Sequence, residues 1–219
     1  RLALRGGAGN FNSEDPLILN FRIVSNNPNI YHILEKKIMK HLSDYLADRR
    51  FGKEGKIQSK DILNTKFSNL RGKVLIFVDD PNKNYIENPN FYELVNASTS
   101  SKLSLYTDYQ VKNENTPEKY KNEAHTKFIL SMPDVMERVN SSWLIHHNNG
   151  VQVVMMNFGG GGFFDDNMLT YIKKFASERK AFVLKPSSLL RTRTIARDPI
   201  EQNPAMNPTS GPALLGAGS

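Results

Sequence analysis

Cysteine is absent from all 219 residues of the chain. Disulfide bridges, thiolate metal sites and cysteine-dependent hydrolases are therefore excluded. The chain also has no apolar run near the ~20 residues that a membrane-spanning helix needs, and no basic start followed by an apolar segment, as a signal peptide would have. Because it begins at Arg1, we expect a segment or a processed product of a longer protein. We expect it to be soluble, and a reducing compartment is compatible with this composition.

Acidic residues are fewer than basic ones, at 22 against 29, and the formal net charge is +7. A basic protein favours anionic partners, and phospholipid headgroups are one such partner. The charges of both signs are interleaved, however, and the chain has no long basic run, no zinc-finger spacing and no aromatic and basic RNA-binding signature. A nucleic-acid partner is therefore not expected, and a nucleic-acid-binding protein is a third hypothesis that rests on net charge alone.

Sequence signals for nucleotide binding and serine hydrolysis are also missing. Four consecutive glycines occupy 159–162, but a phosphate-binding loop needs spaced glycines that open a helix, and a P-loop also needs a Gly-Lys-Ser/Thr sequence. Phe163 and Phe164 follow these glycines instead. The chain has no G-x-S-x-G nucleophile elbow either. These absences argue against a nucleotide-binding loop and a serine hydrolase.

Continuous apolar stretches alternate with amphipathic ones along the chain. The pattern predicts strands at 16–24, 73–78, 102–107, 151–158 and 181–185, helices at 30–46 and 165–177, a short helix or turn from Ser59, and one or two helical pieces within 113–137. Asn29 is the expected N-cap of the first helix, and Asp165 and Asp166 suit the first turn of the last helix. The polar, turn-rich range 82–101 predicts a loop or linker. Buried strands between helices are typical of a parallel α/β sheet, open or closed into a barrel.

The composition changes at the C-terminal end of the chain. Residues 197–219 are rich in proline and glycine and have few residues that form a core, which predicts disorder in isolation. Such a tail becomes ordered by lying against something else. We therefore expect residues 1–196 to form an α/β barrel portion, in which 82–101 separates two halves, and 197–219 to be an extended tail that contacts protein partners in a large assembly.

Several motifs follow one another in a distinctive order between Pro16 and Arg191. They are "PLILNF", "LRGKVLIF", "KLSLYT", "RVNSSW", "GVQVVMMNFGG" and "AFVLKPSSLLR", with a predicted helix after the first. This series resembles the catalytic barrel of phosphoinositide-specific phospholipase C, most specifically in "GVQVVMMNF" and "FVLKPSSLLR". The resemblance implies a partial or complete TIM-type (β/α) barrel similar to the phospholipase C X/Y region, with the glycines at 159–162 in the loop after the seventh strand.

The resemblance also implies a reaction, in which the inositol 2-hydroxyl attacks the phosphodiester with the help of two histidines and a calcium ion. Both histidines and most calcium ligands belong to the first three strands of the family, upstream of the start of this chain. The calcium-binding glutamate of the fourth strand falls on Arg22, and lysines that contact inositol phosphates fall on Phe77 and Asp79. These replacements indicate that the metal- and phosphate-binding chemistry is lost.

Three substrate-binding positions are retained by resemblance. Arg138 and Ser141 lie in "RVNSSW", and Ser104 lies in "KLSLYT". Arg138 has two open interpretations, a bidentate contact with phosphate or an ordinary ion pair with the neighbouring Glu137. None of these residues performs chemistry, so no catalytic residue is predicted.

The remaining candidate side chains favour structural interpretations. Asp79 and Asp80 could hold a cation at a strand end, but Pro81 favours a plain turn. The adjacent His146 and His147 would face opposite ways in a strand, which favours a surface or loop position. No protein metal site is predicted. His32, His41 and His125 have no ligand partners at suitable spacing, and Met155 and Met156 are expected in the core. Asn96 and Asn140 begin glycosylation acceptor patterns, but we expect no glycosylation without a secretory signal.

Two main hypotheses follow. The first is a phospholipase-C-like barrel that is not catalytic, uses no cofactor and serves as a structural or interaction component of a large assembly. Its asparagine- and lysine-rich composition suggests a minor capsid or virion protein of a large DNA virus, located in the virion or the host cytoplasm. The alternative is an active, calcium-dependent phosphoinositide phosphodiesterase whose histidines and calcium ligands lie upstream.

Overall fold

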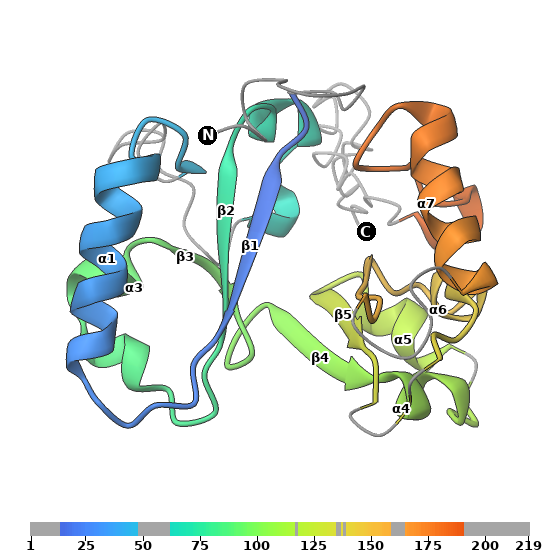
Figure 1. Cartoon of the computed structure of the whole chain (residues 1–219), viewed down its shortest axis with the longest axis horizontal. Coiled ribbons are helices and arrows are strands. Elements are labelled where there is room, and N and C mark those ends of the chain that lie inside the picture. The colour runs from blue at the N-terminus through green and yellow to red at the C-terminus, as the bar shows by residue number, and fades with distance from the viewer. Residues whose placement is uncertain are drawn as a thin grey trace, which may run out of the picture.

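Two parallel sheets and the helices that cover them make up the part of the protein that the structure describes (Figure 1). The structure is a computed structural model, and it describes residues 14–47, 62–116, 118–134, 137, 139–158 and 165–190. The first sheet contains β1 (Leu17–Arg22), β2 (Val74–Asp79) and β3 (Val95–Ser98), and the second contains β4 (Leu103–Thr107), β5 (Phe128–Met132) and β6 (Val153–Val154). The α/β class is confirmed, and the strands of the described residues form these two sheets rather than a closed barrel.

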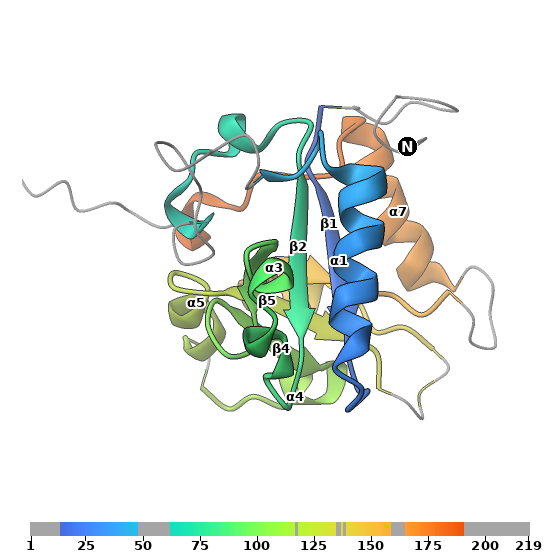
Figure 2. The ribbon, with the colours of Figure 1, turned by 90° about the vertical axis from the view of Figure 1, so that its left-hand side faces the viewer.

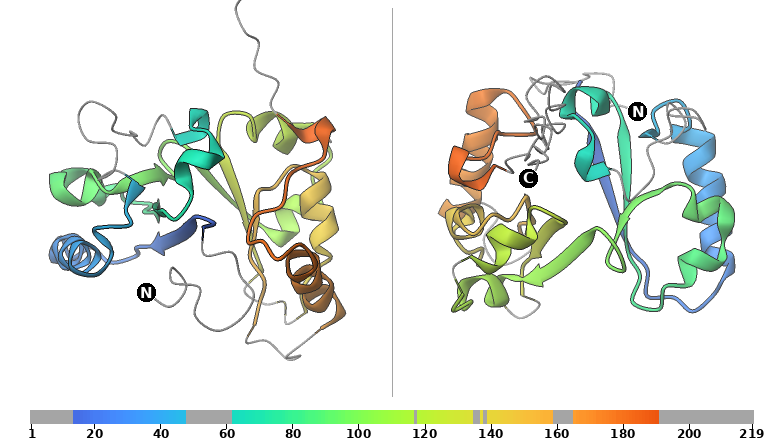
Figure 3. Two further views of the ribbon diagram at one scale, coloured as in Figure 1. Left: turned by 90° about the horizontal axis from the view of Figure 1, so that it is seen from above. Right: turned by 180° about the vertical axis from the view of Figure 1, so that it is seen from behind.

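The helices are mostly short. The α-helices are α1 (Asn29–Leu42), α3 (Pro89–Tyr92), α4 (Asp108–Lys112), α5 (Lys119–Glu123), α6 (Trp143–Asn148) and α7 (Asp166–Glu178), and the 3-10 helices are η1 (Ile62–Asn64), η2 (Phe67–Leu70), η3 (Asn84–Glu87) and η4 (Ser187–Leu189). Figure 2 shows α1 across the outer face of β1 and β2, and Figure 3 places α1 and α7 on opposite sides of the molecule. No helix of the described residues is long and apolar enough to cross a membrane.

Each sheet follows the order of the chain, β1-β2-β3 and β4-β5-β6, and all paired strands are parallel. The connection from β3 to β4 is different, because only residues 99–102 separate the two strands. A crossover between parallel neighbours takes a dozen or more residues. The chain therefore cannot add β4 to the first sheet as the next parallel strand, and a second sheet begins there.

One apolar cluster joins the two sheets, and we call it the inter-sheet core. It contains Met155, which follows β6, and residues from all six strands, among them Ile18, Leu75, Phe77, Ala97, Leu103, Leu105, Phe128, Leu130 and Val153. The alternate residues face outward, toward α1 and α3 in the first sheet and toward α4 and α5 in the second. Burial on both faces explains why these strands appear in the sequence as continuous apolar runs.

Most of the long elements lie where the sequence predicts them. The ranges 16–24 and 102–107 contain β1 and β4, and 73–78 covers β2 except for its last residue, Asp79. The two long predicted helices correspond to α1 and α7. Asp165 caps α7, since its carboxylate accepts a hydrogen bond from the Met168 N–H at 2.7 Å. The predicted cap of α1 was wrong by one residue, because Asn29 is already helical and its N–H donates to the Asn27 side chain.

The predicted loop at 82–101 was wrong, because this range contains η3, α3 and the fully buried β3. The strand is polar, and its polar groups are paired inside the fold. The Asn96 side-chain oxygen accepts from the Ile76 N–H at 2.8 Å, beside a register shift between β2 and β3. The Ser98 hydroxyl lies 2.6 Å from that of Tyr85. These hydrogen bonds let a strand with little apolar character occupy the interior.

Three other predictions need correction. The range 113–137 contains the strand β5 after α5, because "FILSM" pairs with β4 over five residues. The strand predicted at 151–158 is reduced to β6, and 181–185 forms no strand. Side-chain contacts hold this last range instead, including the bond from the Ala181 N–H to the Asp15 carboxylate. The glycines at 159–162, the start of the predicted element at Ser59 and the tail 197–219 lie outside the described residues.

Candidate functional site

An open cleft of about 420 Å³ lies at the carboxyl ends of the strands. Its wall includes the last residues of four strands, which are Arg22, Asp79, Thr107 and Met132. Arg22 and Asp79 stand in alternation with Ile18 and Phe77, so they extend the inward-facing rows of the inter-sheet core. Active sites of α/β proteins form at this end of the strands, which makes the cleft the first candidate.

Arg22 and Asp79 form an ion pair inside the cleft. The two residues are partners in the β1–β2 register, and the Arg22 Nε lies 3.5 Å from the Asp79 Oδ2. The Asp79 side chain is only 9% exposed, whereas that of Arg22 is 57% exposed and also approaches the Met132 sulfur. A guanidinium thus offsets the charge of a carboxylate that is almost completely buried.

Asp80 follows β2 and organises a turn. Its Oδ2 accepts hydrogen bonds from the Tyr31 hydroxyl at 2.8 Å and the Tyr85 N–H at 3.0 Å, while its Oδ1 accepts from the Asn82 N–H at 3.1 Å. Burial, helped by the bond to Asp80, raises the pKa of Tyr31. The prediction that Asp80 lies in a turn is confirmed, because its carboxylate accepts hydrogen bonds from the N–H groups of Asn82 and Tyr85 in the chain that follows β2.

Ser104 belongs to the cleft wall, but its hydroxyl is used by Glu123. Glu123 accepts from the Ser104 and Tyr106 hydroxyls, each at 2.6 Å. Burial of Glu123 opposes its ionisation, but these bonds and Lys127 outweigh it and hold the pKa of Glu123 below its usual range. The substrate-binding role predicted for Ser104 would therefore require it to give up a structural partner.

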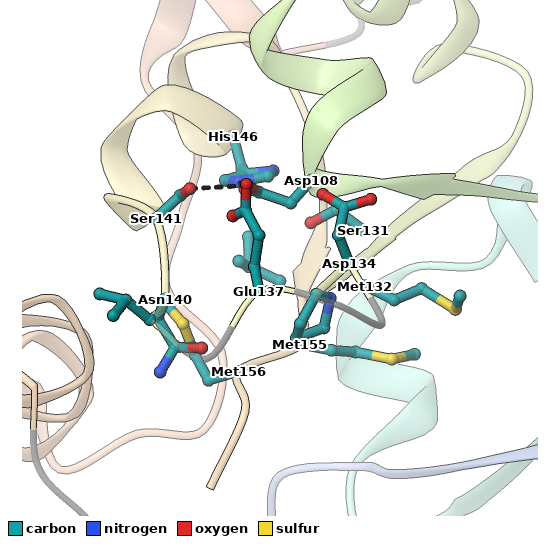
Figure 4. Close-up of a pocket in the computed structure, with 13 residues that line it drawn as sticks. Asp108, Ser131, Met132, Asp134, Glu137, Asn140, Ser141, His146, Met155 and Met156 are labelled. Carbon is teal, nitrogen blue, oxygen red and sulfur yellow. Dashed lines mark hydrogen bonds and ion pairs between the residues drawn. The ribbon is translucent and has the colours of Figure 1, made fainter. Parts of the chain in front are cut away.

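A second, smaller pocket of about 10 Å³ lies between α4, α6 and the end of β5, and Figure 4 shows its lining side chains. Asp108, only 6% exposed, is its central charge. The Asp108 Oδ2 accepts from the Ser141 hydroxyl at 2.6 Å and from the Lys112 ammonium at 2.7 Å. The Asp108 Oδ1 lies 2.7 Å from the His146 Nε2. One carboxylate thus connects three partners.

The protonation states in this pocket follow from burial and hydrogen bonding. Burial opposes ionisation of Asp108, but bonds from Lys112, Ser141 and His146 together hold its pKa below the usual range. Burial lowers the pKa of His146, although Asp108 opposes this effect. A neutral imidazole that donates to an ionised carboxylate agrees with both directions. The Ser141 hydroxyl is bonded to Asp108 rather than to the imidazole, so the pocket has no serine–histidine nucleophile.

The three predicted substrate-binding residues do not meet in one site. Ser104 lies at the cleft, Ser141 lies in the Asp108 pocket, and Arg138 is outside the described residues. Sequence reasoning missed Asp108, although it directly follows a predicted strand, where functional acids of parallel sheets are often found. The surface position predicted for His146 was wrong, because 143–148 is a helix that buries this residue.

Both asparagines of the glycosylation patterns are buried, at 2% exposure for Asn96 and 5% for Asn140. The Asn140 side chain donates to the Asp165 carboxylate and accepts from the Asn157 N–H. These side chains therefore serve the interior rather than the surface. Comparison with protein-family models and with curated proteins finds no match for this chain.

Proposed function

We propose that this chain is a portion of a phospholipase-C-like α/β barrel that is not catalytic and acts as a structural or interaction component of a larger assembly. The Arg22–Asp79 ion pair is the observation that carries the proposal. By the resemblance, Arg22 stands at the position of a calcium-binding glutamate. A cation there, paired with a buried carboxylate, would repel a metal ion rather than hold it.

The arrangement of the strands supports a barrel-like origin. Both sheets are parallel and follow the order of the chain, their inward-facing residues share one core, and the cleft lies at the carboxyl ends. A (β/α) barrel has each of these features. The short connection 99–102 is the point where the described residues depart from its regular alternation of strand and helix.

The side chains of the cleft support a role without catalysis. Cleavage of a phosphodiester needs an acid and a base within reach of the substrate and a stabiliser of the developing charge. Among the described residues that line the cleft there is no histidine, and the one carboxylate, Asp79, is paired with Arg22. The proposed role in an assembly rests on the composition of the tail 197–219. The asparagine- and lysine-rich composition of the chain is the basis for proposing a minor capsid or virion protein.

Phosphoinositide hydrolysis tests this proposal directly. The full chain is incubated with phosphoinositide-containing vesicles in calcium and, separately, in a calcium chelator, and release of inositol phosphate is measured beside an active phospholipase C. We expect release at the buffer level in both conditions. Calcium-dependent release above that level would overturn the proposal and support the phosphodiesterase alternative.

A further inference from the structure

We propose that Asp108, Asp134 and Glu137 form a binding site for one hard divalent cation, Mg²⁺ or Ca²⁺. Each of the three residues offers a carboxylate oxygen, and these oxygens all lie within 4.8 Å of one another. Oxygen ligands sit about 2.0–2.6 Å from such ions, so ligands on opposite sides of one ion are about 4–5 Å apart. The three carboxylates are thus close enough to share a single ion.

Ser131 supplies an independent observation at the same place. This residue of β5 is 1% exposed and lines the pocket beside the acids (Figure 4). Its Oγ is buried and has no hydrogen-bond partner among the described residues. A buried hydroxyl without a partner is rare and costs free energy. An ion in the pocket, or a water bound to that ion, would provide the missing partner.

The charge of the pocket also fits a divalent ion. Among the described residues, Lys112 forms ion pairs with two of the acids, with its Nζ 2.7 Å from Asp108 and 3.5 Å from Glu137. Among the described residues, the formal charges of three carboxylates and one ammonium leave an excess of negative charge, which a divalent ion would offset.

The donors and the space define the kind of ion. Carboxylate and hydroxyl oxygens are hard ligands, which suit Mg²⁺ and Ca²⁺ better than metals that prefer thiolate or imidazole. A volume of about 10 Å³ admits one ion or one water but no larger ligand. The Glu137 side chain is 47% exposed, so solvent can complete the coordination from that side. The bound ion would join α4 to the segment that follows β5.

Titration calorimetry of the full chain with MgCl₂ and with CaCl₂ tests the site. Sensitised Tb³⁺ luminescence gives a second readout, because Trp143, the single tryptophan of the chain, begins α6 two residues after Ser141 of the pocket. We expect one saturable site, and affinity at least about tenfold weaker in Asp134→Asn, equivalent to about 1.4 kcal/mol. Asparagine can still accept the bond that the Tyr109 N–H donates to Asp134 at 2.7 Å. Glu178→Gln, which removes a carboxylate on α7, should bind like the wild type.

Lys112→Gln tests whether the ammonium of Lys112 competes with the bound ion. If Lys112 competes with the ion for the same oxygens, its removal should tighten binding by about tenfold. A purely structural role of Lys112 would lower stability without raising affinity. Glu137→Gln, at a half-exposed position, replaces Asp134→Asn if that variant fails to fold.

Two outcomes would overturn the proposal of a cation site. One is the absence of saturable binding up to about 10 mM, above the weakest range of protein calcium sites. The other is binding by the folded carboxylate variant that matches the wild type. Neither outcome bears on phosphoinositide hydrolysis, so this inference and the proposed function can fail separately.

Discussion

Buried and partly buried acids of this protein are stabilised by particular neighbouring groups. Asp79 pairs with a guanidinium, Asp80 accepts from two backbone N–H groups and a tyrosine, and Glu123 accepts from two hydroxyls. None of these partners is close in the sequence to Asp79 or Glu123. The sequence therefore predicted where strands end but not which acids become structural, because pairing across 17 to 57 residues depends on the register of the sheets.

Glu123→Gln tests this network at the scale of a residue. The pKa of Glu123 lies below its ordinary 4.5 in the folded state, so its carboxylate stabilises the fold above that pH and loses this effect as the pH falls through the folded value. The variant should be about 1–3 kcal/mol less stable at pH 7 and should lose less stability on acidification.

Urea denaturation at neutral and acidic pH measures both effects. Glu118→Gln is the control, because that side chain is 63% exposed and pairs only with Lys121 among the described residues. It should change stability by about 0.5 kcal/mol or less. If the stability of the wild type and that of Glu123→Gln depended equally on pH, the stabilising role of the Glu123 carboxylate would be refuted.

A strand can be predicted from the sequence when apolar burial stabilises it, but not when hydrogen bonds to distant residues do. β2 is six consecutive buried residues, and its apolar run is visible in the sequence. β3 is equally buried but contains asparagine and serine, whose compatibility with the interior depends on hydrogen bonds from distant residues. β5 is a short run between charged segments, and only its pairing with β4 identifies it as a strand. Both β3 and β5 are strands because of pairing with distant residues, which no local sequence pattern shows.

The turn between α6 and β6 offers a test at this scale. Gly150 has a φ of +86°, and a Cβ there would lie 3.2 Å from the Lys121 Cα. Gly72 also has a positive φ, +65°, but a Cβ there would meet nothing within 4 Å. Gly150→Ala should therefore cost more than Gly72→Ala, about 2–3 against about 1 kcal/mol. Chemical denaturation of both variants measures the difference, and equal costs would mean that the contact with α5 is not tight.

The whole molecule depends on the inter-sheet core. Phe77 of β2 is fully buried, and its ring lies 4.9 Å from that of Phe128 in the second sheet. Side chains of both sheets thus fill one interior, so neither sheet can expose its inner face without uncovering the other. We expect the two sheets to unfold together.

Phe77→Ala tests this cooperativity. The variant should lose about 3–5 kcal/mol, because a large side chain leaves a cavity between the sheets. Circular dichroism follows both sheets, whereas Trp143 fluorescence reports on the second, and the two midpoints should coincide in the variant. Ile33→Ala, at a half-exposed position on α1, should have a small effect. Separate midpoints would show that each sheet is an independent unit.

The connection at 99–102 is the natural place to cut the chain in two. It is the one place in the strand order where the chain passes from one sheet to the other, and no ladder hydrogen bonds join β3 to β4 among the described residues. A cut there leaves every ladder intact and gives two fragments, each with a complete three-stranded sheet and one bare apolar face. Those faces are complementary, so the fragments should reassemble when mixed, as a split protein does.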